Sequence, residues 1–189
     1  MQNSVPKGEG GMTAVLGTTI EVVENLLGEN QNNFKVEIAN DNSEGQIVLS
    51  GKISELEKIM LDLKKKKIKN IKLPVSAPFH CDLMAPAAEV MQTALDNVTL
   101  SDAVVPVVCN VTATAESDAE MLRANLVTQV CSRVRWRETL MMLGQSEITH
   151  FIELGTGKVL SGLVKRTLDD VSIANLDGTA DLDNVMAHF

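Results

Sequence analysis

The chain has few aromatic residues, few cysteines and a deficit of positive charge. Aromatic residues make up 3% of its 189 residues, with one tryptophan and no tyrosine, whereas 44% of the residues are hydrophobic. Aliphatic side chains and nine methionines must therefore fill the core, and a chain this apolar is expected to fold. The formal net charge of −8 repels phosphate backbones and anionic membrane surfaces, which argues against binding to nucleic acid or to membranes.

Cysteine usage and the N-terminal segment exclude further classes of protein. Cys81, Cys109 and Cys131 are too few and too widely spaced for a disulfide framework, and none belongs to a CxxC pair. The sequence therefore predicts three reduced thiols and no metal site. Residues 1–6 lack a basic segment followed by an apolar one, and no apolar run approaches the length of a membrane span. These absences predict a soluble, cytoplasmic protein.

Residues 11–75 show the pattern of a small β-α-β-β-α-β unit. Alternating or short apolar runs predict strands at residues 12–16, 34–38, 47–49 and 71–73. Two amphipathic helices are predicted between them, each opened by a capping box, Thr18 with Glu21 and Ser54 with Glu57. This order is that of the ferredoxin-like, or split βαβ, arrangement.

The remainder of the chain predicts an α/β arrangement of another kind. Helices are predicted from Pro86, after a third capping box of Ser117 with Glu120, and at residues 136–143, 159–164 and 182–186. Strands are predicted at residues 104–108, 151–154 and 172–176, the first of them as a short buried strand. Strands that alternate with helices indicate a mostly parallel, covered sheet.

Of the three histidines, His80 is the candidate for chemistry. It follows Pro78 and Phe79, a stiff apolar pair, and precedes a predicted helix, so its flanks suit a positioned general base. His150 is expected on the surface, and His188 lies next to the C-terminus. A lone histidine is more often structural than catalytic, so this pattern alone leaves both interpretations open.

Several segments, spread over nearly the whole chain, carry a set of spaced motifs. They are SAPFHCDLMAPAA at residues 76–88, MQNSVPKGEGGM at 1–12, NDNSEGQIV at 40–48, PVVCNV at 106–111, VRW at 134–136 and ELGTGKVLSGL at 153–163. In this order they resemble malonyl-CoA:acyl-carrier-protein transacylases and the acyltransferase domains of fatty-acid and polyketide synthases. Several motifs in family order are far more specific than any one of them.

The resemblance implies an α/β-hydrolase-like large subdomain with a ferredoxin-like small subdomain inserted into it. Residues 1–10 would end the N-terminal part of the large subdomain, residues 11–75 would form the small subdomain, and residues 76–189 would form the C-terminal part of the large one. The implied activity is S-malonyltransfer from malonyl-CoA to the phosphopantetheine thiol of acyl carrier protein, in fatty-acid biosynthesis. These two molecules are the implied partners, and no cofactor is implied.

The resemblance also assigns roles to individual residues. His80 would be the general base and acid of a Ser-His pair, and the backbone carbonyl of Gln129 would orient it. For Gln129, a plain helix residue is the alternative. Phe79 matches the position that separates malonyl-type from branched-extender acyltransferases. Asn40 and Asn42 match polar residues that line the cleft between subdomains, with ordinary Asx-turn chemistry as the alternative.

One family motif has no counterpart in the chain. The nucleophile of the family lies in a G-H-S-L-G turn, and no GxSxG occurs anywhere in this sequence. The GQG segment of the oxyanion hole and the arginine that pairs with the malonyl carboxylate are also missing. We therefore expect a C-terminal portion that is inactive alone and that could be completed by an N-terminal fragment. The alternative is a non-catalytic module that binds the carrier protein or another partner.

A run of four lysines, residues 64–67, closes the second predicted helix. Cations at this end complement the helix dipole, so a solvated helix end is the simpler interpretation. A docking patch for the acidic carrier protein is the alternative.

Overall fold

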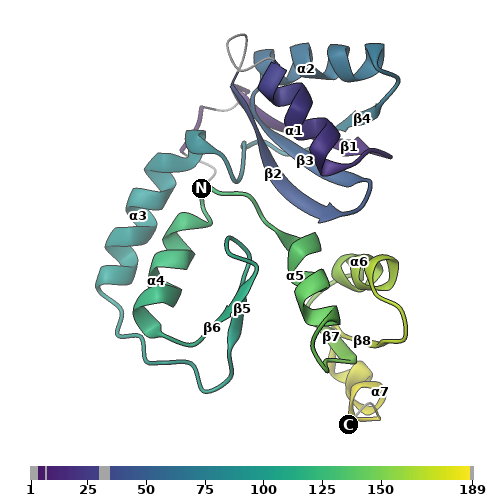
Figure 1. The fold of residues 1–189 in the computed structure, drawn as a ribbon. Coiled ribbons are helices and arrows are strands. Elements are labelled where there is room, and N and C mark those ends of the chain that lie inside the picture. Colours follow the sequence, from purple (N-terminus) through teal and green to yellow (C-terminus); the bar gives the residue numbers. More distant parts are fainter. Residues whose placement is uncertain (1–3, 7, 30–34, 188–189) are drawn as a thin grey trace. The chain divides into compact units, whose positions relative to one another are not determined.

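The computed structural model describes residues 4–6, 8–29 and 35–187 (Figure 1). The chain divides into two compact units, Met1–Trp136 and Arg137–Phe189. Helices and strands are mixed in both units, so the predicted α/β fold class is confirmed. The boundary between the units lies after Trp136, and the predicted subdomain boundaries at residues 10 and 75 stay predictions.

The first unit contains a four-stranded antiparallel sheet with the strand order β2-β3-β1-β4. Its elements follow one another along the chain as β1 (Gly10–Leu16), α1 (Ile20–Glu29), β2 (Val36–Ser43), β3 (Gln46–Lys52), α2 (Ile53–Lys65) and β4 (Lys69–Lys72). The order β-α-β-β-α-β is the one that the apolar pattern predicts for this stretch.

Helices α1 and α2 cover the same face of this sheet (Figure 1). Ten buried apolar residues from the helices and strands form the core between them, namely Val15, Ile20, Val23, Leu26, Val36, Ile47, Leu49, Leu56, Ile59 and Leu63. Each such side chain contributes about 1.5–3 kcal/mol when it leaves water, so the apolar stripes hold both helices on the sheet.

The opposite face of the sheet carries a smaller apolar cluster. Met12, Ala39 and Val48 are buried there, because successive side chains of a strand point to alternate faces. Leu73 and Phe79, which follow β4 in the chain, pack against this cluster. The second face of the sheet therefore holds the segment that leads to His80.

Strand β2 extends beyond the predicted strand at residues 34–38. Phe34 lies outside the described residues. The strand continues to Ser43, because two register shifts let it keep its pairing with β3. The turn that follows is short, and Gly45 adopts a positive φ of 76° in it.

The predicted capping box of Ser54 and Glu57 is wrong. Helix α2 begins at Ile53, and its N-cap residue Lys52 makes no side-chain cap bond. The backbone N–H of Ile53 donates to the carbonyl oxygen of Glu9 at 2.8 Å instead. A carbonyl from the chain before β1 thus gives a hydrogen-bond partner to a backbone N–H at the start of α2, where no side chain caps the helix.

The rest of the first unit contains η1 (Asp82–Met84), α3 (Ala85–Asp96), β5 (Val107–Cys109), β6 (Thr114–Glu116) and α4 (Ala119–Thr128). Pro86 lies in the first turn of α3, as its position predicts. Helices α3 and α4 lie side by side (Figure 1). Val5, Met84, Ala87 and Val130 form a second core cluster in this region.

The third predicted capping box is also wrong. The N-cap of α4 is Asp118, whose carboxylate accepts a hydrogen bond from the backbone N–H of Met121 at 2.8 Å. The box of Ser117 with Glu120 is therefore displaced by one residue. Aspartate caps a helix as well as serine does, so the local sequence contains two candidates and the structure uses the second.

The predicted buried strand at residues 104–108 differs from the structure. Strand β5 begins only at Val107, while Val104 is fully exposed and Val105 is 74% exposed. Among the described residues, β5 pairs with β6 alone, in an antiparallel hairpin. The apolar composition of this valine run predicts burial, but its side chains are largely exposed to solvent in this chain.

Helix α5 (Trp136–Gly144) begins at the last residue of the first unit and continues into the second. The second unit also contains β7 (His150–Leu154), α6 (Val159–Thr167), β8 (Ser172–Leu176), η2 (Thr179–Asp181) and α7 (Leu182–Met186). Strands β7 and β8 pair in parallel, and α6 connects them. The strands and helices predicted for this region are confirmed. In the part of the chain that the structure describes, however, the parallel sheet consists of these two strands. None of the helices described is long and apolar enough to cross a membrane.

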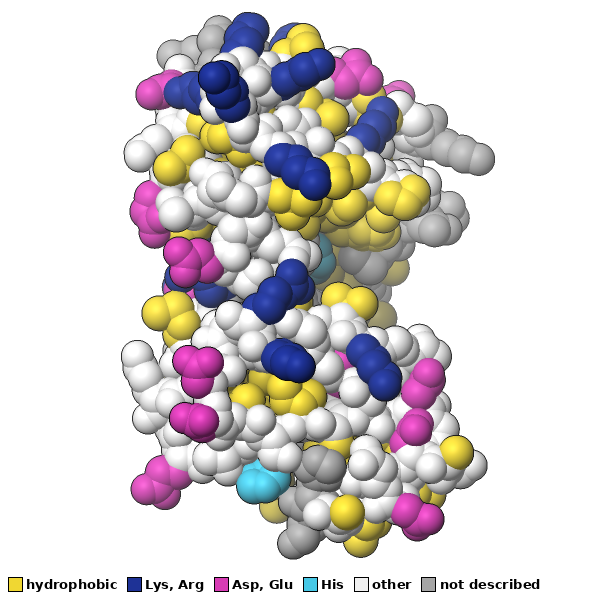
Figure 2. All heavy atoms as spheres, turned by 90° about the vertical axis from the view of Figure 1, so that its right-hand side faces the viewer, with side chains coloured by type: hydrophobic (Ala, Val, Ile, Leu, Met, Phe, Trp, Pro, Cys, Tyr) yellow, Lys and Arg dark blue, Asp and Glu magenta, His cyan; other side chains and the backbone are white. Residues whose placement is uncertain are grey.

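Lysine side chains gather at the end of helix α2. Figure 2 shows Lys and Arg side chains grouped over the part of the first unit that α2 forms. Lys65 pairs with Asp62 at 2.8 Å and Lys66 pairs with Glu29 at 3.4 Å. Such exposed pairs add little stability, and they are typical of a solvated helix end.

The last turn of α2 closes with a strained residue. Lys67 has a left-handed φ of 60°, and the backbone N–H of Ile68 donates to the carbonyl of Leu63 at 2.9 Å. This is a Schellman-type end with lysine at the position where glycine is the usual residue. The backbone conformation of Lys67 costs about 1 kcal/mol, because its Cβ approaches the following carbonyl.

We therefore expect the substitution Lys67→Gly to raise the free energy of unfolding by about 0.5–1 kcal/mol. The midpoint of urea unfolding measures this change. Lys64→Gly, inside the same helix, is the matched control and should lower the stability by about 1 kcal/mol. A loss of stability in both variants would show that the left-handed conformation carries no strain.

Candidate active site at the His80 loop

His80 lies in the loop between β4 and α3, and the residues before it are fixed by packing. Phe79 packs against two apolar clusters. One is the cluster of Met12, Ala39 and Val48 on the sheet, and the other is the second core cluster, which includes Met84. Pro78 is fully buried, and a Cβ placed on Gly10 would overlap its ring. Only glycine at position 10 allows this close approach, so the His80 loop packs directly against the backbone of β1.

The backbone of His80 is strained. Its φ is 60°, in the left-handed region, which costs a residue with a Cβ about 1–2 kcal/mol. Such conformations persist only where the surroundings hold them, and they cluster at functional sites. The conformation of His80 is therefore held by its surroundings.

The imidazole of His80 is held by helix α4. Its Nδ1 lies 2.9 Å from the backbone carbonyl oxygen of Gln129, a residue 49 positions further along the chain. Gln129 is the C-cap of α4, so its carbonyl is among those that have no partner inside the helix. A carbonyl can only accept a hydrogen bond, so Nδ1 carries the hydrogen. The lone pair of Nε2 is then free to accept a proton.

His80 opens onto a hollow of about 540 Å³ in the first unit. The hollow is lined by α1, β2, the His80 loop and the segment that follows α4, with the residues Glu24, Leu27, Gly28, Glu37, Ile38, His80, Asp82, Cys131, Ser132 and Arg133. Arg133 donates to Glu24 at 2.8 Å across this hollow. The half-buried imidazole therefore has access to a solvent-filled space with charged walls.

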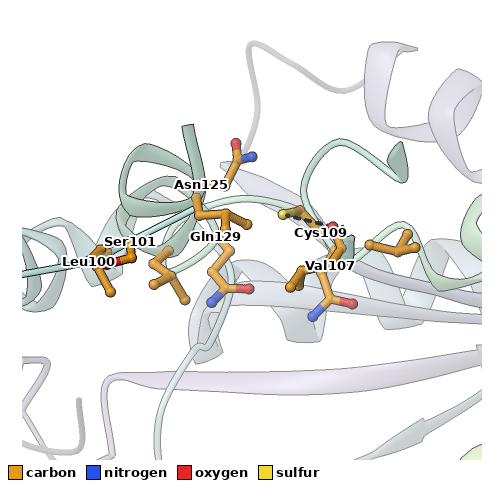
Figure 3. A pocket seen from close by; sticks show the side chains of 10 residues that line it. Leu100, Ser101, Val107, Cys109, Asn125 and Gln129 are labelled. Carbon is orange, nitrogen blue, oxygen red and sulfur yellow. Dashed lines mark hydrogen bonds between the residues drawn. The ribbon is translucent and has the colours of Figure 1, made fainter. Parts of the chain in front are cut away.

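Gln129 also borders a second, apolar cavity of about 270 Å³ (Figure 3). The cavity lies between α4 and the β5–β6 hairpin, and its lining includes Leu100, Val107, Cys109 and Asn125. Gln129 therefore takes part in two features of the first unit. Its backbone carbonyl binds His80, while its side chain lines the apolar cavity.

Asn40 and Asn42 lie in β2 and are half-buried there. The main chain beside Asn40 pairs with Val134, because the N–H of Asp41 donates to Val134 at 2.9 Å and Val134 donates to Ala39 at 2.8 Å. Neither asparagine is among the described residues that line the hollow at His80. The structure therefore brings His80, Phe79 and Gln129 together, and the substrate-binding role of the two asparagines stays a prediction.

Burial shifts the pKa of three groups near His80, namely Glu37, Cys81 and Cys131. Burial raises the pKa of the Glu37 carboxyl, and the nearby Asp82 charge adds to this, whereas the backbone N–H of Asp82 acts against it. Burial also raises the pKa of the Cys81 thiol and of the Cys131 thiol. The raised pKa values favour the neutral thiol, which is the less reactive form of cysteine. In the described part of the chain, no group of three acidic, histidine or cysteine side chains could hold a metal ion.

This chain is similar to known proteins in both sequence and fold. No family model matches it. The malonyl CoA-acyl carrier protein transacylase of Salmonella typhimurium is 37% identical over 183 residues, which cover 96% of this chain and 59% of that protein. The protein of the same name from Bacillus subtilis is 40% identical over 168 residues, 88% of this chain and 53% of that protein.

Solved structures agree with these relatives. The acyl-carrier-protein S-malonyltransferase of Bartonella henselae matches with a TM-score of 0.93 and 37% identity, over 99% of this chain and 60% of that one. The chain is a homologue of the malonyl CoA-acyl carrier protein transacylases. It corresponds to their C-terminal portion and spans 59% to 60% of the length of the first curated relatives that it matches. A malonyl-transacylase in complex with a type II PKS acyl-carrier protein matches with a TM-score of 0.92 and 33% identity, over 100% of this chain and 61% of that one.

The transacylase resemblance directs attention to His80 but not to Glu37. Glu37 reaches the loop through a hydrogen bond from the backbone N–H of Asp82 to its Oε1, at 3.0 Å. In the sequence, Glu37 is the polar member of an alternating strand, a pattern that indicates exposure to solvent. No local signal distinguishes it, because its partner lies 45 residues further along the chain.

The thiols should differ in reactivity. We expect iodoacetamide at pH 8 to modify Cys81 about a hundredfold more slowly in the native chain than in urea. Cys81 is fully buried, and its exposure requires unfolding that costs several kcal/mol. Mass spectrometry of timed samples measures the rate at each cysteine. Half-buried Cys109 is the internal control and should differ less between the two conditions. Equal rates at Cys81 in both conditions would contradict its burial.

The raised pKa of Glu37 predicts a pH-dependent stability. The native state binds the proton of this carboxyl more tightly than the unfolded state, whose ordinary value is 4.5. Its contribution to stability is therefore complete below that pH and is lost as the pH rises through the raised pKa. With Glu37→Gln, the urea midpoint should fall less between pH 4.5 and neutrality. Glu44→Gln, in the exposed turn after β2, is the control and should keep the original profile.

Proposed function

We propose that this chain is the part of an S-malonyltransferase that supplies the general base. The observation that supports this proposal most strongly is the 2.9 Å contact between Nδ1 of His80 and the carbonyl oxygen of Gln129. This contact fixes one tautomer, leaves Nε2 unoccupied and holds a strained residue at a hollow. Relatives named as malonyl CoA-acyl carrier protein transacylases support the choice of malonyl-CoA and acyl carrier protein as substrates.

The proposed reaction has two half-reactions that both use Nε2 of His80. In the first, Nε2 takes the proton of a serine hydroxyl while the serine oxygen attacks the thioester carbonyl of malonyl-CoA. The tetrahedral intermediate expels the CoA thiolate, which receives the proton from the imidazolium, and a malonyl-serine ester remains. In the second, the carrier-protein thiol gives its proton to Nε2 and attacks the ester. The serine leaves and recovers the proton.

The nucleophilic serine of this scheme belongs to another segment. The chain has no GxSxG turn, so we propose that it is inactive alone and that a fragment equivalent to the rest of the relatives completes it. The β5–β6 region supports this, because Val104, Val105 and Val107 expose apolar side chains there. Contiguous exposed apolar surface on a soluble protein marks a place where another segment packs.

Phe79 is proposed to limit the size of the acyl group. Its ring is wedged between the two apolar clusters, so it cannot swing away easily when a branched extender approaches. Discrimination against one additional methyl group is worth about 1–3 kcal/mol. We propose further that Asn40 and Asn42 contact the substrate, as polar residues on the strand next to the hollow.

The second candidate is a non-catalytic module that binds acyl carrier protein. It is favoured by the lysines that close α2 and by the acyl-carrier-protein complex of one structural neighbour. The acidic carrier would meet a basic helix end. This candidate predicts carrier binding without any transfer.

A chimera distinguishes the two candidates. This chain replaces the matching 183 residues of the Salmonella typhimurium relative, which supplies the remaining 41% of its own length. We expect the chimera to transfer malonyl from malonyl-CoA to the carrier protein, as measured by intact-protein mass spectrometry. His80→Ala should lower kcat about 10²–10⁴-fold, because it removes the general base.

His150→Ala is the matched control for the chimera. His150 is exposed at the start of β7 and should leave kcat unchanged. The chain alone should form no malonyl-serine adduct. A folded chimera that keeps full activity without His80, or an adduct on the chain alone, would contradict the proposal.

A further inference from the structure

We propose that Glu37 is a positioning residue that holds His80 in its working conformation. The inference rests on the proposed function, in which His80 is the general base. Glu37 lies on β2, and its Oε1 accepts the backbone N–H of Asp82 at 3.0 Å. Asp82 follows His80 by two residues, so this bond ties the downstream end of the His80 loop to the sheet.

The hydrogen bond gives the backbone N–H of Asp82 an acceptor that the neighbouring residues do not provide. Asp82 is the first residue of η1, and the N-cap of η1, Cys81, makes no side-chain cap bond. The first N–H groups of a helical segment have no partner within it. The carboxylate of Glu37 provides this partner from another element, and an ionised acceptor makes the bond stronger than a neutral one.

His80 needs a restraint on each side because its backbone is strained. On the upstream side, Pro78 is buried against Gly10. On the downstream side, the thiol of Cys81 donates to the carbonyl of Pro78 at 3.1 Å, and the backbone N–H of Asp82 donates to Oε1 of Glu37 at 3.0 Å. Of these two bonds, the one to Glu37 ties the loop to the sheet. If this bond is lost, φ of His80 can return to the ordinary region, and Nδ1 can then leave the carbonyl of Gln129.

The surroundings of Glu37 favour positioning over an ion-pair role. Glu37 lines the same hollow as His80, Glu24 and Arg133. Arg133 is paired with Glu24 at 2.8 Å, so the arginine of the hollow is directed at the other carboxylate. Glu37 instead directs an oxygen at the loop that carries His80. It therefore acts through His80 and does not need to touch the reacting atoms.

The tautomer of His80 in the full 189-residue chain provides the test. Long-range proton–nitrogen NMR of the imidazole should show hydrogen on Nδ1 in the unsubstituted chain, because Nδ1 faces a carbonyl. Glu37→Met keeps the length of the side chain but removes the acceptor. It should shift the population towards hydrogen on Nε2, the form that free imidazole side chains prefer. Glu37→Gln keeps an acceptor oxygen and should retain the original tautomer.

Two further variants separate geometry from charge. Glu37→Asp keeps the charge but is one methylene shorter, so it should behave like Glu37→Met, and it serves if the methionine variant does not fold. Glu24→Met removes a carboxylate from the same hollow without touching the loop, and it should leave the His80 tautomer unchanged. An unchanged tautomer in both Glu37→Met and Glu37→Asp would overturn the inference. So would an equal shift in Glu24→Met.

The chimera separates this inference from the proposed function. In it, Glu37→Met should lower kcat about 10–100-fold with little change in KM, and Glu37→Gln should restore most of the loss. If His80→Ala leaves the chimera fully active, the proposed function fails, whatever the tautomer shows. If His80→Ala abolishes activity while Glu37→Met changes neither the tautomer nor kcat, the positioning role alone fails.

Discussion

The contact between the His80 imidazole and the carbonyl of Gln129 is the interaction on which the geometry of the candidate site depends. It joins a loop that follows the sheet to the C-cap residue of α4. An unpaired carbonyl at a helix end is a fixed acceptor, because the helix holds its direction without any contribution from a side chain. The position of the His80 imidazole therefore depends on where α4 ends, and it does not depend on which side chain stands at position 129.

The packing around this contact explains why a strained histidine is tolerated. Phe79 belongs to two apolar clusters at once, and Pro78 occupies the space that the missing side chain of Gly10 leaves free. Together these contacts outweigh the about 1–2 kcal/mol that the left-handed backbone costs. The two faces of the four-stranded sheet thus pack against different parts of the chain. One face holds α1 and α2, and the other holds the loop that carries His80.

The sequence predicts the elements that depend on local periodicity and misses those that depend on distant partners. The strand at residues 172–176 and the amphipathic stripe of α2 are recognisable, because apolar spacing reflects burial on one side. The start of α2 is not, because the carbonyl of Glu9 replaces the expected cap at Ser54. His80 is a candidate from its stiff flanks, and the family resemblance adds Gln129. The contact of Glu37 with the His80 loop has no sequence signal, because a carboxylate bound to a backbone N–H leaves no pattern in its own segment.

The pairing of Val134 with β2 has a consequence for the length of the chain between α4 and the sheet. Val134 is bound through its main chain to Ala39 and Asp41, and the carbonyl of Gln129 is bound to His80, so both ends of a four-residue connection, 130–133, are anchored. Such a connection works as a spacer of fixed length. Changes of side chain within it alter the wall of the hollow, whereas the insertion or loss of a single residue would force one of the two anchors to release. Natural variation in this connection should therefore take the form of substitutions and not of changes in length.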